Sequence, residues 1–375
     1  MDKTRIFKAR IRLGILLVAA AIFAQATIFR VGGDYQGQDQ GQGQSQGQGQ
    51  DLDFNMEDYL AEIEAEYAFA LNGYLQNDIP VQQLIGLSDA IFLSPPEDLP
   101  PLPRPAPRTQ LLLPSDEYLQ QLTNFDYLTS RIFLVDRYTI LFPSDVDVRE
   151  FAAMDFSIDT ATNGPQVLIF HTHSMEDFVD SDPDDKMTGV VGVGRYLAEV
   201  LAEVHGIEVI HYYTTRFDMV DGRSDRGPSY ERMEPVIKQI LADNPSIQMV
   251  IDLHRDGIDE SLGPLVTYID GRRTAQIMFV NGLSRRYRNG VVTDLTWLYN
   301  PNQRENLAFT FHLQLAANQL YPGLARRAYL AQFRYSLHMM PRSMLVEVGA
   351  QNNTLQEALN AVYPLADIIA AVVGG

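Results

Sequence analysis

Short aliphatic runs alternate with amphipathic helical patterns over the second half of the chain. Each run is rich in β-branched or long apolar residues and ends in polar and turn-forming residues, as central strands do. These predicted strands span residues 166–170, 207–213, 247–253 and 343–349. Helices are predicted around them over residues 194–204, 229–241, 304–320 and 354–372. The alternation predicts an α/β fold with a mostly parallel sheet flanked by helices on both faces.

One stretch breaks this alternation. Residues 265–268 and 275–280 are apolar or β-branched, and they flank Asp270 and Gly271, a dipeptide typical of tight turns between strands. We therefore expect a β-hairpin here, before the helix predicted at 304–320.

Three of the predicted strands end in histidine or carboxylate side chains. The first runs into His171, His173 and Glu176, the third into His254, and the fourth contains Glu347. Ligands of parallel α/β sheets bind outside the carboxyl ends of the strands, so these groups are expected to converge. The sequence thus places the candidate chemistry at one edge of the sheet.

The spacing of these residues predicts a catalytic zinc site. Such sites often take two ligands from a short spacer and a third from far along the chain, which leaves a position for water. His173 and Glu176 supply the short pair and His254 the distant ligand. Glu347 is the candidate to shuttle the proton of an activated water. The structural alternatives are a hydrogen-bonded histidine at a strand end and, for Glu347, a pairing with an arginine.

His171 has the same parity as His173 on an extended strand, so both could face a metal. Only His173 forms the His-x-x-Glu spacing. His171 is therefore expected to support the ligands or to contact substrate.

Several segments together resemble one known family, stage II sporulation protein P. They are His-Thr-His-x-x-Glu at 171–176, Asp-x-His-Arg-Asp at 252–256, Asn-Leu-Ala-Phe at 306–309, Tyr-Pro-Gly-Leu at 321–324, Leu-Val-Glu-Val-Gly at 345–349, and Asn-Thr-Leu at 353–355 with Glu357 and Ala358. Their order and spacing match over residues 160–372. The resemblance implies a zinc-dependent N-acetylmuramoyl-L-alanine amidase that cleaves peptidoglycan during engulfment of the forespore. It also implies partnership with stage II sporulation proteins D and M.

Position by position, the resemblance implies that His173, Glu176 and His254 bind Zn²⁺ and that Glu347 is the catalytic carboxylate. Arg255 matches an arginine that follows the second metal-site histidine. Its guanidinium suits a substrate carboxylate or a developing oxyanion, whereas the structural alternative is a salt bridge to Asp252 or Asp256.

Two alternatives to the amidase stay open. The same residues are compatible with a zinc peptidase or endopeptidase acting on wall peptides. A third possibility is a non-catalytic scaffold for wall remodelling, which the intact set of polar residues disfavours.

The N-terminal part of the chain has four distinct compositions. Five basic residues precede an uncharged stretch at 13–29, which predicts a cytoplasmic basic tip and a transmembrane signal anchor over 1–30. The catalytic domain would then be extracytoplasmic. Ala24-Gln25-Ala26 resembles a signal-peptidase site, so cleavage is the competing hypothesis. A Gln/Gly-rich tether (31–53), an acidic amphipathic helical segment (54–93) and a Pro-rich linker (94–109) follow, before a catalytic domain at 110–375.

The composition narrows the partners and the chemistry. A formal net charge of −19 argues against nucleic acid as a partner. The absence of cysteine excludes disulfides, thiol catalysis and cysteine metal sites.

Overall fold

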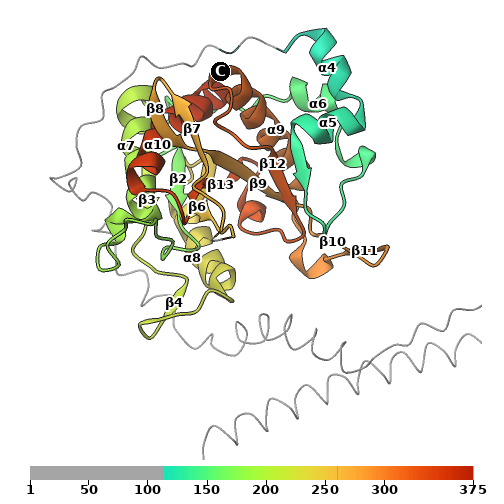
Figure 1. Ribbon diagram of the computed structural model, residues 1–375. Helices are drawn as coiled ribbons and strands as arrows, with labels where there is room; N and C mark the ends of the chain where they lie inside the picture. Colours follow the sequence, from blue (N-terminus) through green and yellow to red (C-terminus); the bar gives the residue numbers. More distant parts are fainter. Residues whose placement is uncertain (1–110, 112–113, 260, 375) are drawn as a thin grey trace, which may run out of the picture. The chain divides into compact units, whose positions relative to one another are not determined.

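The computed structural model describes residues 111, 114–259 and 261–374 (Figure 1). The predicted anchor, tether, acidic helical segment and Pro-rich linker therefore lie outside the described residues. Within the described part, no helix is both long and apolar enough to cross a bilayer.

A seven-stranded sheet forms the centre of the described part of the chain. Its strand order is β1-β12-β9-β13-β6-β2-β3. The β13–β9 pair is antiparallel, whereas the other five neighbouring pairs are parallel. The prediction of an α/β fold with a mostly parallel sheet is confirmed. The strands are β1 (Phe133–Val135), β12 (Ala328–Ala331), β9 (Ile277–Gly282), β13 (Ser343–Ala350), β6 (Met249–Asp256), β2 (Val167–Phe170) and β3 (Val209–Tyr212).

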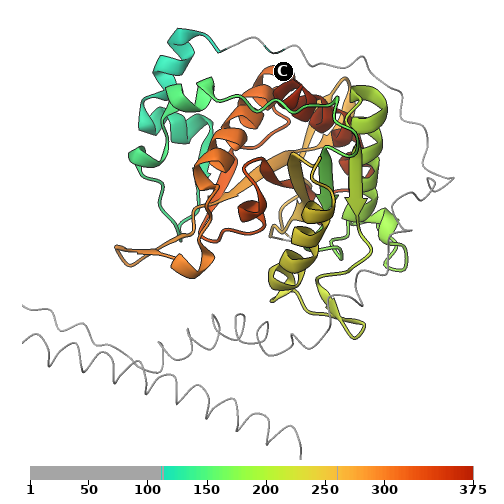
Figure 2. The same cartoon turned by 180° about the vertical axis from the view of Figure 1, so that it is seen from behind.

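Three long helices pack on one face of this sheet. They are α7 (Val190–His205), α9 (Gln303–Leu320) and α10 (Leu355–Val373), and their apolar sides form the main core with alternate residues of the strands. The smaller helices α4 (Asp116–Leu122), α5 (Phe125–Arg131) and α6 (Val148–Ala153) add to the same core beside β1 and α9 (Figures 1 and 2).

The opposite face is only partly covered. Helix α8 (Ser229–Asp243) packs Met233 and Ile237 against Leu168, Phe170 and Val250 of β2 and β6. Over β13 and β9, the outward side chains instead meet a short loop around the 3₁₀ turn η4 (Leu337–Met339). Helices therefore flank both faces as predicted, but one half of the second face is left to loops, and this half carries the site.

Two boundaries of the predicted central strands and helices differ from the structure by three residues or more. Helix α7 begins at Val190, not at residue 194, and contains Gly192 and Gly194, whose low helix propensity weakens the sequence pattern. Strand β6 continues through His254 to Asp256, because its polar end pairs with β13. His254 is thus a residue within a strand, not one beyond its tip.

The predicted hairpin at Asp270 and Gly271 is present as β7 (Val266–Ile269) and β8 (Arg272–Ala275). The apolar run that was assigned to its second arm mostly belongs to β9, which enters the main sheet. Short or polar elements escaped the sequence pattern altogether. They are β1, β12, α4 to α6, and the ribbons β4 (Met219–Val220) with β5 (Arg223–Ser224) and β10 (Arg285–Arg288) with β11 (Val291–Asp294).

Candidate metal centre and its cavity

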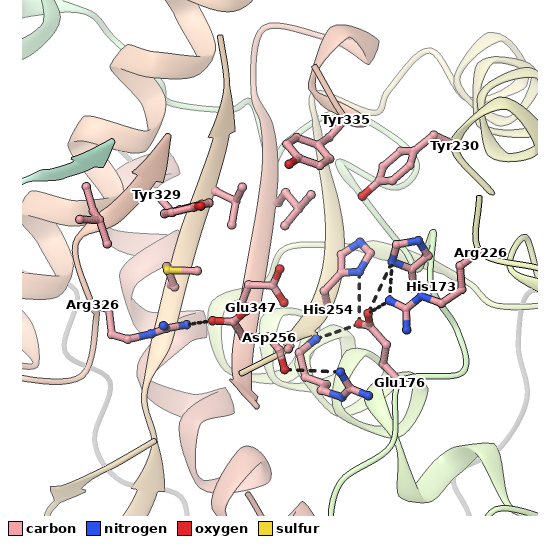
Figure 3. A pocket seen from close by; sticks show the side chains of 16 residues that line it. His173, Glu176, Arg226, Tyr230, His254, Asp256, Arg326, Tyr329, Tyr335 and Glu347 are labelled. Atoms are coloured by element: carbon pink, nitrogen blue, oxygen red, sulfur yellow. Dashed lines mark hydrogen bonds and ion pairs between the residues drawn. The ribbon is translucent and has the colours of Figure 1, made fainter. Parts of the chain in front are cut away.

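A cavity of about 620 Å³ opens on the half of the sheet that has loops in place of a helix (Figure 3). Its floor consists of outward side chains of β6, β13, β9 and β12, and its walls come from the loops after β2, before α8 and after β12. The polar and charged residues in its lining are His173, Glu176, Arg226, Tyr230, His254, Arg255, Asp256, Arg326, Tyr329, Tyr335 and Glu347. All five residues predicted for the site therefore line one cavity.

The structure brings His173, Glu176 and His254 into one group. One ligand atom from each lies within 4.8 Å of the others. Glu176 Oε1 is 3.5 Å from His173 Nδ1, and Glu176 Oε2 is 3.2 Å from His254 Nδ1. His173 and Glu176 come from the loop after β2, and His254 comes from the middle of β6. Glu176 and His254 are buried, whereas His173 is partly open to the cavity.

A second carboxylate orients His254 from the side opposite Glu176. Asp252 Oδ1 lies 2.7 Å from His254 Nε2. Asp252 is itself fully buried and accepts hydrogen bonds from the backbone N–H (2.9 Å) and the hydroxyl (2.7 Å) of Thr172. Asp252 and His254 are two residues apart in one strand, so both point to the same face. A carboxylate behind the outer nitrogen of a histidine is the usual support of a metal-binding imidazole.

These contacts shift the ionisation of the group. Burial alone would lower the pKa of His254, but the charges of Asp252 and Glu176 raise it well above its ordinary value. Burial alone would raise the pKa of Glu176, but the charge of His254 and its hydrogen bonds hold it well below the usual range. Burial lowers the pKa of His173. In the metal-free group Glu176 is therefore ionised and His254 protonated, and a bound cation would replace that proton.

The donor set suits a divalent zinc ion. Two imidazoles and one carboxylate are a ligand set of catalytic zinc sites. His254 can offer Nδ1 because Asp252 holds its Nε2, and His173 Nδ1 faces the other carboxylate oxygen of Glu176. The residues present therefore fit the metal, and the contact of Asp252 with Nε2 of His254 is the kind that orients a metal-binding imidazole.

Glu347 lies beside this group on the neighbouring strand. It is in direct register with His254 across the β13–β6 pair. Its Oε2 is buried and has no hydrogen-bond partner among the described residues. Burial raises the pKa of Glu347 to about 8, so it titrates near neutrality. The arginine pairing considered from the sequence is not formed, because the nearby Arg326 pairs with Asp256 at 2.6 Å.

Arg255 lines the cavity, but its guanidinium is engaged with backbone oxygens. Its Nε donates to the carbonyl of Asp177 at 2.9 Å, and a terminal nitrogen donates more weakly to that of Asp256 at 3.4 Å. Its backbone N–H donates to Glu176 Oε2 at 3.0 Å. Arg255 thus forms neither of the salt bridges considered from the sequence, and its backbone helps to hold a predicted ligand.

His171 takes no part in the cavity. It is buried on the side of α7, where Nδ1 lies 2.7 Å from the carbonyl of Leu253 and Nε2 lies 2.8 Å from His211 Nε2. A Cβ at Gly194 would come within 2.6 Å of the His171 ring, so α7 approaches it closely. His171 therefore does not line the cavity where substrate would bind, but it does contact the backbone of Leu253, directly before the predicted ligand His254.

The predicted site residues did not include Arg226, Tyr230 and Tyr335 of the cavity lining, nor Arg326 and Tyr329. Arg226 precedes α8, and one terminal nitrogen of its guanidinium donates to Glu176 Oε1 at 2.5 Å. The same nitrogen lies 3.0 Å from His173 Nδ1. Tyr230, in the first turn of α8, and Tyr335, in the loop after β12, form part of the wall. Arg226 and Tyr335 lie in loops, which follow no periodicity, and the helical pattern around Tyr230 does not distinguish a site residue. Asp252, two positions before His254, was detectable from spacing.

The described residues 123–370 match the family model described as stage II sporulation protein P (SpoIIP). Stage II sporulation protein P of Bacillus subtilis (strain 168) is 26% identical over 219 residues, which cover 54% of this chain and 49% of that protein. The chain thus spans about half the length of the curated relative that it matches.

Among solved structures, the CwlD amidase of Clostridioides difficile in complex with the GerS lipoprotein is 13% identical. The match covers 56% of this chain and 95% of that chain, with a TM-score of 0.33. The N-acetylmuramoyl-L-alanine amidase AmiC2 of Nostoc punctiforme is 12% identical over 56% of this chain and 97% of that chain, with a TM-score of 0.32. The family match covers well over half of the sequence, and the chain belongs to the stage II sporulation protein P family.

Proposed function

We propose that this protein is a zinc-dependent N-acetylmuramoyl-L-alanine amidase that acts on peptidoglycan in sporulation. The observation that supports this most directly is the group of His173, Glu176 and His254, with Glu347 in register beside it in one cavity. Membership in the stage II sporulation protein P family supports the substrate.

His173, Glu176 and His254 would hold the zinc ion. When bound, zinc supplies Lewis acidity, which polarises a carbonyl and makes water more acidic. Asp252 keeps the His254 ring in its orientation through Nε2. The backbone N–H of Arg255 fixes Glu176 in the same way. The protein thus orients the ligands through a buried carboxylate and a backbone N–H group.

Glu347 would move the proton. Its free Oε2 can accept a proton from the attacking water and deliver it to the amide nitrogen as the C–N bond breaks. A pKa near neutrality allows the same group to serve as base and then as acid. The products would be a glycan with a free lactyl carboxylate and a stem peptide with a free amino terminus.

The test is digestion of purified peptidoglycan by the full chain loaded with zinc. Wild type, Glu347→Gln and, as a matched control, the exposed Glu208→Gln are compared by mass analysis of the fragments. The proposal expects glycan strands freed of stem peptides from the wild type and the control, and none from Glu347→Gln. Cuts confined to the peptides would replace the amidase by a peptidase. Absence of zinc-dependent release by the wild type would refute both.

We also propose that residues 1–30 anchor the protein in the cell membrane, with the catalytic part outside. The support is the basic cluster followed by the uncharged stretch at 13–29. Protease digestion of intact and of permeabilised cells tests this orientation, since the catalytic part should be cleaved in both. Contact with stage II sporulation proteins D and M stays a prediction of the resemblance.

A further inference from the structure

Two tyrosines form the wall of the cavity beside the metal-ligand group. Tyr230 lies in the first turn of α8, and Tyr335 lies in the loop that joins β12 to η4. Their ring centroids are 5.6 Å apart, and the Tyr230 ring lies 5.6 Å from that of His173. Figure 3 shows both hydroxyl oxygens directed toward the cavity that His254 and Glu347 face. The pair therefore lies where an amide bound at this group would lie.

Neither hydroxyl makes a hydrogen bond with a described residue, although both rings are largely enclosed. Enclosed tyrosine hydroxyls usually find a partner. Other tyrosines of this protein do so, since Tyr329 donates to Asp136 and the hydroxyl of Tyr212 lies 2.6 Å from that of Thr215. The two hydroxyls at the site are thus available as donors.

The backbone of Tyr335 has an unusual conformation. Its φ is +51°, in the left-handed region that a bulky side chain rarely adopts. The preceding residues are fixed, because Arg334 donates to Glu234 at 2.8 Å and to the carbonyl of Tyr299 at 3.1 Å. A Cβ at Gly282 would also lie 1.8 Å from the carbonyl oxygen of Phe333, so β9 needs a glycine there. The loop is held so that the Tyr335 ring enters the cavity.

The cavity arginines already hold other acceptors, although Nε of Arg326 is buried without a partner among the described residues. Arg226 donates to Glu176, Arg255 to the carbonyl of Asp177, and Arg326 to Asp256. Glu176 is ionised, Asp256 accepts from Arg326, and Glu347 is needed to move the proton, so no lining carboxyl group is left to stabilise new negative charge. A reaction that creates charge on a carbonyl oxygen needs donors aimed at that oxygen.

We infer that the hydroxyls of Tyr230 and Tyr335 donate hydrogen bonds to the oxygen of the scissile carbonyl as it gains negative charge. The inference rests on the proposed amide hydrolysis. The attacking water forms the new C–O bond, the C–N bond breaks, and the water proton passes through Glu347 to the departing nitrogen. Both tyrosines keep their protons throughout and act only as donors.

The test compares Tyr230→Phe, Tyr335→Phe and the double variant, each of which removes one oxygen per site and keeps the ring. Tyr363→Phe is the matched control, because Tyr363 lies on α10 across the sheet. The assay is hydrolysis of a soluble muramoyl-peptide fragment by the full chain, with zinc content and thermal unfolding measured on every sample. We expect kcat to fall on the order of 10- to 100-fold for each single variant, with KM, zinc content and unfolding midpoint nearly unchanged.

A second measurement does not depend on turnover. A phosphinate that replaces the scissile amide carries a tetrahedral anionic group and imitates the charged state. Calorimetry should show its affinity falling by a similar factor in Tyr230→Phe and Tyr335→Phe, while the control matches the wild type. Unchanged kcat and unchanged phosphinate affinity in an active enzyme would overturn the inference alone. A rise in KM without loss of kcat would also overturn it, because the tyrosines would then bind the ground state. An inactive wild type would refute the proposed function and the inference together.

Discussion

Replacing Glu347 by glutamine should stabilise the metal-free protein, and by an amount that depends on pH. Glu347 lines the cavity, its Oε2 is buried without a hydrogen-bond partner among the described residues, and burial raises its pKa to about 8 from 4.5. The unfolded chain therefore releases a proton above pH 4.5 that the folded chain retains until about pH 8. Because the folded state binds more protons over this range, its stability falls as pH rises from 4.5 to 8. A glutamine at this position has no proton to lose.

The size of the effect follows from the two pKa values. At pH 5 the raised pKa of Glu347 lowers the free energy of unfolding by less than about 1 kcal/mol. At pH 7 it lowers this free energy by about 3 kcal/mol. For a domain of this size, 3 kcal/mol corresponds to a rise in unfolding midpoint of roughly 6–12 °C. The Glu347→Gln variant should therefore match the wild type at pH 5 and exceed it clearly at pH 7.

Thermal unfolding of the full chain in a chelator, followed by circular dichroism at pH 5, 6, 7 and 8, measures this difference. Glu208→Gln removes an exposed carboxylate and should leave the midpoint unchanged at every pH. A Glu347→Gln midpoint that equals or falls below the wild type at pH 7 would refute the reasoning. So would a difference of constant size across the range, since it would then reflect packing and not ionisation.

Three further outcomes are expected. Gly194→Ala places a methyl group against the His171 ring and should destabilise the protein by about 2 kcal/mol, seen as a lower urea midpoint; an unchanged midpoint would show that α7 can shift. Asp252→Asn removes the carboxylate behind His254 and should weaken zinc binding by roughly 10- to 100-fold in competition with a chromophoric chelator, whereas equal affinity would deny its orienting role. Arg226→Gln removes a cation from two of the ligand atoms and should strengthen zinc binding by up to about tenfold in the same assay; weaker binding would mean that this arginine supports the ligands.

The elements with a regular hydrophobic pattern could be predicted from the sequence. Central strands such as β2 are continuous apolar runs, and their helical partners have clear amphipathic patterns, so both were detected with small boundary errors. The insertion of β9 next to β13 in the opposite direction was not predictable, because strand order depends on which faces meet in three dimensions. The sequence assigned that run to a hairpin arm on local turn chemistry alone.

The candidate ligands were predictable for a different reason. His173 and Glu176 are three residues apart, and His254 ends an apolar run, so spacing alone selected them. Parity could not separate His171 from His173, because parity holds only while the strand continues, and β2 ends at Phe170. The place of Tyr335 in the cavity could not be predicted from local pattern, since it depends on the close approach of its loop to Gly282.

The charges around the ligand group explain why a cation fits there. Glu176 and Asp252 are both buried and both held in the ionised form by their neighbours. In the metal-free protein the compensation comes from a protonated His254 and from the guanidinium of Arg226. Two buried carboxylates thus attract about two positive charges, one from a proton and one from a side chain that is 44% exposed. A divalent ion supplies the same two positive charges at one point, so the His254 proton and the Arg226 guanidinium are no longer needed there. Its binding should therefore release the proton of His254 and let Arg226 move toward solvent.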